Sequence, residues 1–275
     1  MFCANFFRTV MLLVCMLAAI ALLLASNIGT IGKQMTKSSI FLLELNTKGI
    51  DIASLYPKAG SVSISELGIA EAYIFGMYGY CRGVQGQSTT NAETHWEDIH
   101  FTSSECTPSS TSYTFDPLNF MIDEINEHNT LGIKVTESDL NLPGGLAGYV
   151  KTASHISQVI YICSIIAICL LVLSVMCSLL CWCIGSTALI IFLQNLAFVS
   201  AVISTGCATG AFKYIESEFN KYGTSFGVHA QLSRNYLVLA WLGTGMILLS
   251  VLVTTVTQCC CCVGRPVTTT FDRVL

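Results

Sequence analysis

Uncharged apolar runs alternate with polar stretches along this chain of 275 residues. Thr9 to Ser26 contains no charged side chain, and Thr152 to Phe212 contains no Asp, Glu, Lys or Arg. A helix of about 20 residues crosses a 30 Å hydrocarbon core, so the longer run suits two helices joined by a turn. A last apolar run ends just before Cys259. The pattern therefore predicts four transmembrane helices, at 9–30, 156–180, 187–210 and 236–258.

A cleaved signal peptide is the alternative interpretation of the first run. The apolar stretch of a signal peptide usually has about 7 to 15 residues and is followed by a small-x-small cleavage site. The run that begins at Thr9 is longer, and Leu24-Ala25-Ser26 is a poor site of that kind. An uncleaved first helix is therefore favoured.

The composition agrees with a membrane protein. Hydrophobic residues make up 53% of the chain and charged residues 11%, whereas soluble domains carry about 25% charged residues. The net charge of −4 offers no basic surface to nucleic acid, which is therefore not an expected partner. The apolar runs make membrane lipids the expected partners. The four predicted crossings contain no charged side chain, which argues against ion or proton transport by these helices.

The long polar stretch, residues 31–154, has the pattern of a small folded domain. Ile40 to Leu45 suits a strand, Leu67 to Tyr80 suits one or two strands bent at glycines, and Ile99 to Ser103 suits another. Gly83 to Glu97 is polar and is predicted to be a surface loop. These segments predict a small β-sheet.

A helix is predicted after these strands. Asp116 suits the N-cap and Pro117 the first helical position. An apolar stripe follows at helical spacing, with Asp123, Glu124 and Glu127 assigned to the opposite face. The stripe consists of Leu118, Met121, Ile122 and Ile125.

Two of the 14 cysteines, Cys81 and Cys106, lie in the long polar stretch, and the others lie in or beside apolar runs. An isolated pair in a folded domain outside the cytosol is typical of a disulfide. The alternative is two free thiols on the cytosolic side of the membrane. The disulfide is favoured, and it would clamp the predicted sheet.

Cysteine chemistry also decides the orientation, because the positively charged residues are divided between both sides. Four crossings place both termini on one side. A disulfide suits an oxidising exterior, whereas four consecutive cysteines after the last crossing suit the cytosol. We therefore predict a multi-pass protein with cytosolic segments 1–8 and 259–275, and an extracellular domain and second loop at 31–154 and 211–235. Juxtamembrane cysteines are candidates for S-palmitoylation, or simply form an apolar helix end; they are Cys259, Cys260, Cys261 and Cys262.

Short motifs in the polar stretch resemble those of a known family. Gly76-Met77-Tyr78-x-x-Cys81, followed by Cys106, resembles the Gly-Leu-Trp-x-x-Cys…Cys signature of claudin-like tetraspan proteins. Phe115-Asp116-Pro117 is similar to a pattern of the fungal PalI/Sur-seven family, and the chain most resembles a nitrogen-stress-induced yeast plasma-membrane member. The resemblance implies a mainly α membrane protein: a four-helix transmembrane bundle carrying a small disulfide-clamped extracellular β-sheet domain.

The resemblance also implies a function. Members of this family are plasma-membrane proteins of furrow domains associated with eisosomes, tied to cell-wall integrity and to stress or morphogenetic responses. A scaffold of this kind would self-associate laterally or contact other tetraspan proteins. Two alternatives remain open: a claudin-like regulator of calcium influx, or a pH-sensing subunit that uses His95, His100 and His128.

No residue pattern indicates catalysis, a cofactor or a metal site. The chain has no Gly-x-Ser-x-Gly elbow, no His-Glu-x-x-His and no phosphate-binding glycine loop, so we predict no enzyme activity. Gln194 and Asn195 are expected to form interhelical hydrogen bonds. Gly206 and Gly210 have a spacing that allows close helix packing, within the bundle or between copies.

Overall fold

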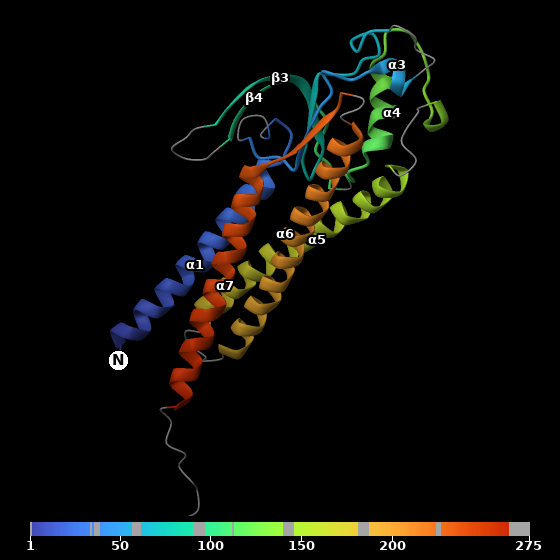
Figure 1. Ribbon diagram of the computed structural model, residues 1–275. Helices are drawn as coiled ribbons and strands as arrows, with labels where there is room; N and C mark the ends of the chain where they lie inside the picture. Colours follow the sequence, from blue (N-terminus) through green and yellow to red (C-terminus); the bar gives the residue numbers. More distant parts are fainter. Residues whose placement is uncertain are drawn as a thin grey trace, which may run out of the picture.

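The computed structural model describes residues 2–33, 35, 39–56, 62–90, 97–111, 113–139, 146–180, 187–223 and 227–263. Four long helices form a bundle, and a sheet domain lies at one end of it (Figure 1). Among the described residues, four helical segments are long and apolar enough to cross a membrane: Thr9–Gly29, Ser154–Leu180, Ala188–Lys221 and Arg234–Val256. The helices that contain them are α1 (Phe2–Gly29), α5 (Leu146–Leu180), α6 (Thr187–Gly223) and α7 (Arg234–Val263).

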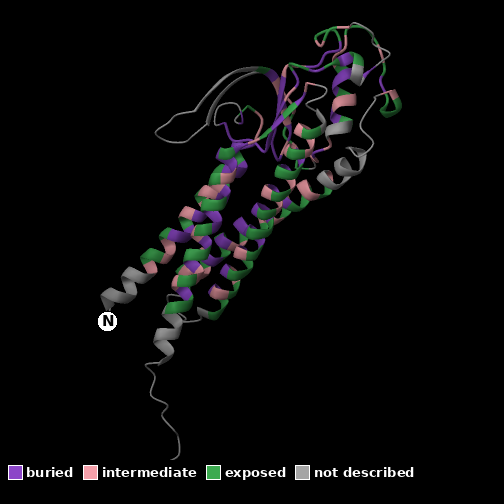
Figure 2. Ribbon diagram, in the orientation of Figure 1, coloured by how far each residue is buried: buried purple, intermediate pink, exposed green. Residues whose placement is uncertain are grey.

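The outer faces of these helices are apolar. Figure 2 shows exposed positions along all four helices. They include the large apolar residues Leu17, Met176, Phe192 and Leu252. Such a surface is unfavourable in water, but it matches the hydrocarbon of a bilayer. α6 continues past its apolar part to Gly223, so its last turns join the sheet domain.

Five strands form one antiparallel sheet in the order β4-β3-β2-β1-β5. The strands are β1 (Leu43–Asn46), β2 (Ala72–Phe75), β3 (Tyr80–Thr90), β4 (Glu97–Cys106) and β5 (His229–Leu232). The predicted strand positions are broadly confirmed. The loop expected at Gly83 to Glu97 is wrong for its first half, because β3 continues to Thr90 and pairs with β4.

The central strands β1 and β2 are buried on both faces of the sheet. Leu45 and Tyr73 are directly opposite each other and belong to the main apolar cluster, which also includes Phe212 of α6. Ile74 and Cys81 lie on the other face and pack with residues that follow α1. Because side chains alternate along a strand, a short sequence such as β2 contributes to two cores.

The sheet ties the ends of two helices together. β1 follows α1 in the chain, β5 precedes α7, and the two strands are neighbours in the sheet. The amide of Asn235, at the start of α7, also donates a hydrogen bond to the carbonyl of Ser39 at 3.1 Å. The start of α7 is therefore held, through β5 and Asn235, against the segment that follows α1 in the chain.

The described part of the domain also contains three short helical elements: α3 (Ile52–Leu55), α4 (Pro117–His128) and the 3-10 turn η2 (Glu137–Asp139). α4 begins at Pro117, as predicted. Oδ1 of Asp116 accepts a hydrogen bond from the backbone N–H of Asn119 at 3.1 Å, which caps the helix.

Candidate functional site

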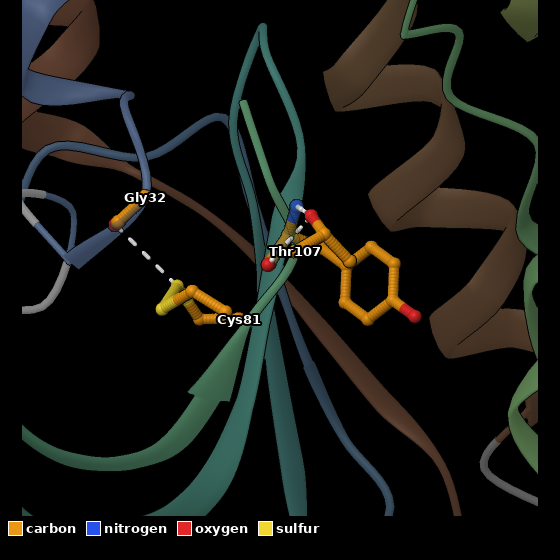
Figure 3. Close-up of a disulfide and its surroundings, with 5 residues drawn as sticks. Gly32, Cys81 and Thr107 are labelled. Atoms are coloured by element: carbon orange, nitrogen blue, oxygen red, sulfur yellow. Dashed lines mark hydrogen bonds between the residues drawn. A yellow bond between two sulfur atoms is a disulfide. The ribbon is translucent and has the colours of Figure 1, made fainter. Parts of the chain in front are cut away.

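Cys81 and Cys106 form a disulfide between β3 and β4, where the two residues are directly opposite each other. This confirms the predicted bond. Sγ of Cys81 lies 3.4 Å from the carbonyl oxygen of Gly32, and Figure 3 marks this contact. A disulfide sulfur carries no proton, so this is a sulfur–oxygen contact and not a hydrogen bond. The disulfide thus faces the segment that follows α1.

The residues of the Gly76-Met77-Tyr78 motif attach the sheet to the bundle. Gly76 begins a tight turn, its N–H donating to the carbonyl of Gly79 at 2.8 Å. A Cβ at this position would overlap the carbonyl oxygen of Thr30 at the end of α1. The ring of Tyr78 packs edge-on against Tyr161 of α5, with centroids 5.6 Å apart. The turn can therefore lie directly on the helix ends only with glycine at position 76.

A buried ion pair lies on the opposite face of the sheet from the disulfide. Nη1 of Arg82 is 2.8 Å from Oε1 of Glu124, whose side chain is completely buried. The Tyr80 hydroxyl donates to Oε2 of Glu124 at 3.0 Å, and Nη2 of Arg82 donates to the carbonyl of Gly68 at 2.7 Å. Tyr80 and Arg82 flank Cys81, so strand alternation places them together on the α4 side.

The position of Glu124 corrects the sequence-based assignment of this residue to the exposed face of the helix. Phe120, one turn earlier, is buried, and residues at i and i+4 share a helix face. The buried face therefore runs through Phe120, Glu124 and Ile125, and it is rotated from the stripe that was expected. The aromatic residue at position 120 was the signal that could have revealed this.

Burial raises the pKa of Glu124 above its ordinary value. The Arg82 guanidinium, the Tyr80 hydroxyl and His128 act in the opposite direction. Burial, reinforced by the charge of Glu124, also raises the pKa of Tyr80. His128 extends the network: Nδ1 lies 3.7 Å from Glu124, and Nε2 lies 3.7 Å from Glu105 on β4. One carboxylate thus links α4 to β3 and, through His128, to β4.

Aromatic rings surround this network and connect it to the membrane helices. Their contacts are mostly edge-to-face, with centroids 4.6 to 6.4 Å apart, a favourable arrangement for such rings. Phe115 packs at 5.8 Å from Phe212 of α6, so the cluster reaches the bundle. The rings in the outer domain belong to Tyr73, Phe75, Tyr80, Phe115 and Phe120.

The bundle contains a buried polar layer to which each of its four helices contributes one residue. Thr254 of α7 donates to Oε1 of Gln194 on α6 at 2.8 Å. Nε2 of Gln194 lies 3.2 Å from Sδ of Met16 on α1, and the Ser174 hydroxyl of α5 lies 3.5 Å from the same sulfur. The thioether is a weak acceptor, so the amide supplies the stronger link of the layer.

The other residues predicted for helix packing lie differently. Asn195 is exposed, and its amide donates to the carbonyl of Ile191 in its own helix at 2.8 Å. A Cβ placed on Gly206 or Gly210 would meet no atom within 4 Å. These glycines therefore make no close contact with another helix in the described chain, and packing between copies stays a prediction.

Other predicted residues lie partly outside the described part of the chain. Cys259 to Cys262 belong to the last turns of α7, and their acylation stays a prediction. His95 lies outside the described residues, and His100 lies on β4. Among the residues that the structure describes, no group of three or more His, Cys, Asp or Glu side chains could hold a metal ion.

A polar pocket of about 360 Å³ lies beside β1, β5 and the outer end of α6. Its lining includes the carboxylates of Glu44 and Glu216, the exposed His229 and the amide of Asn220. Both polar atoms of that amide are occupied by the backbone of Ala230. The pocket thus includes a side chain that fastens β5 to α6.

Four apolar helices, a small antiparallel sheet at one end of them and a disulfide between β3 and β4 define a claudin-like tetraspan membrane protein. The model of the SUR7/PalI family matches residues 7–253, so the chain belongs to this family. The resemblance inferred from its motifs is thereby confirmed. Protein PUN1 of Saccharomyces cerevisiae (strain ATCC 204508 / S288c) is 21% identical over 240 residues, which is 86% of each chain. No solved structure matches the chain.

Proposed function

We propose that this chain is a non-enzymatic scaffold of the plasma membrane that organises eisosome-associated membrane domains. Through these domains it would support cell-wall integrity and the response to stress or morphogenetic signals. The observation that carries the proposal is the continuous packing of the outer domain onto the bundle, through the aromatic cluster and Phe212. A domain attached in this way presents a fixed surface to neighbouring molecules. Membership of the SUR7/PalI family, on whose resemblance this role was expected, supports the proposal.

In this proposal residues 31–154 and 211–235 lie outside the cell, and both termini lie in the cytosol. The disulfide supports this orientation, because such bonds persist in oxidising compartments and are rare in the cytosol. Membrane lipids surround the helices, and lateral contacts between copies, or with other tetraspan proteins, build the domain. Acylation of Cys259 to Cys262 would add a lipid anchor at the cytosolic end of α7.

The disulfide provides the test. Closing a loop between residues 25 apart stabilises a fold by about 3.5 kcal/mol in the chain-entropy model. We expect a fluorescent fusion of the wild type to form discrete, immobile plasma-membrane patches in a fungal cell. Cys81→Ser should instead be retained inside the cell or spread evenly, and its mobility on a non-reducing gel should change. Cys169→Ser removes a free, exposed cysteine and is the matched control.

Two outcomes would contradict the proposal. An even distribution of the wild type would refute the scaffold role. Normal patches and unchanged gel mobility in Cys81→Ser would show that the disulfide does not support that role.

A further inference from the structure

α6 exposes an amide within the apolar part of the bundle. Asn195 lies about 12 Å along the helix axis from Thr187, at 1.5 Å per residue, and so falls within a 30 Å hydrocarbon core. Its Nδ2 bonds to Ile191, and its Oδ1 accepts no hydrogen bond from the described residues. Lipid tails cannot donate one, so a polar side chain here is costly unless another protein group meets it.

Asn195 belongs to a regular exposed stripe, which we call the α6 seam: Asn195, Val199, Val202 and Gly206. All four residues are exposed, whereas the neighbouring Gln194 is buried. Their spacing of four, three and four residues is that of two helices packed in a left-handed pair. The free space around Gly206 would let a second helix approach closely. The seam ends before Lys213, which pairs with Glu216 at 2.7 Å.

We propose that the α6 seam binds a second copy of this chain, parallel to the first and related to it by a two-fold axis along the membrane normal. An amide both donates and accepts, so Asn195 is complementary to Asn195 of a second copy. A two-fold axis brings identical residues to the same depth. A single asparagine at such a seam also fixes the register of the pair. This inference rests on the lateral association in the proposed function and identifies its surface.

The test uses the full chain, labelled with donor or acceptor dyes and reconstituted in phosphatidylcholine vesicles. Energy transfer is measured against the protein-to-lipid ratio. Asn195→Leu should weaken the association about tenfold, a typical effect of an interhelical amide bond. Gly206→Leu should weaken the association as well. The leucine side chain fits on the surface of a single copy, but it would clash with the helix of the second copy.

Thr255→Val is the matched control. Thr255 is exposed on α7 and bonds to the carbonyl of Val251 in its own helix at 2.8 Å, so this change should leave energy transfer unaltered. Near-ultraviolet circular dichroism checks that each variant keeps its aromatic core. Energy transfer at the wild-type level in both seam variants would overturn the seam, while lateral association itself would stand.

A wild type that stays monomeric in vesicles but forms patches in cells would also overturn the seam, because a different membrane protein would then supply the contact. Absence of both energy transfer and patches would refute the proposed function as well.

Discussion

The buried pair of Arg82 and Glu124 makes the stability of the outer domain depend on two residues together. Removing one partner leaves the other charge buried without compensation, at a cost of about 3–5 kcal/mol. Arg82→Met and Glu124→Met should therefore each destabilise the domain by that amount. Replacing both leaves the Tyr80 hydroxyl and the Gly68 carbonyl without their bonds to this pair, about 1–3 kcal/mol each, and removes the 3.7 Å contact between His128 and Glu124.

The double variant should consequently be about as stable as either single variant, and the coupling free energy should be about 3 kcal/mol or more. The assay is urea unfolding of the purified full chain in detergent micelles, followed by near-ultraviolet circular dichroism of the aromatic cluster. A second cycle on Lys48 and Glu71 serves as the control. These residues form an exposed pair at 3.9 Å, for which we expect coupling below about 1 kcal/mol. Additive costs at Arg82 and Glu124 would refute the reasoning.

Two further predictions concern the same domain. Gly76→Ala should lower stability by at least about 1–3 kcal/mol, because the methyl group would overlap the carbonyl of Thr30. Gly245→Ala, inside α7 with free space around it, should be neutral or slightly stabilising, because alanine favours a helix more than glycine does. A thermal melt that shows equal effects of the two changes would contradict this. Because the raised pKa of Glu124 keeps a proton on the folded state after the unfolded chain has lost it, stability should fall as pH rises from about 4.5 through that pKa. This fall in the free energy of unfolding with pH should be absent in Glu124→Gln. The measurement is urea unfolding of both proteins across this pH range, and a wild type whose stability rises with pH would contradict the prediction.

Local chemistry explains why several features could be predicted from the sequence. A polar segment with only Cys81 and Cys106 leaves one possible pairing within it, and the start of α4 depends on the adjacent residues Asp116 and Pro117. The four helices could be predicted from long uncharged runs because each membrane crossing must be long and apolar by itself, whatever the rest of the chain does.

The features that could not be predicted depend on contacts between distant segments. Glu124 was assigned to solvent because its helix was considered alone, whereas the structure places Arg82 of β3 beside it. The continuation of β3 to Thr90 depends on the partner strand β4 and not on its own polar sequence. The outward position of Gly206 depends on which face of α6 meets the other helices, and small residues suit either side.

The pairing of β1 with β5 has a mechanical consequence for the bundle. Membrane helices adapt to a thinner or thicker bilayer by changing their tilt. α7 begins at Arg234, directly after β5, which pairs with β1, and the carbonyl of Thr30, just after α1, lies against Gly76 at the end of β2. The ends of both helices are therefore attached to the same sheet. The two helices must therefore lean together, and the sheet must turn with them. A local change in membrane thickness would thus reorient the surface that the sheet domain presents beyond the bilayer.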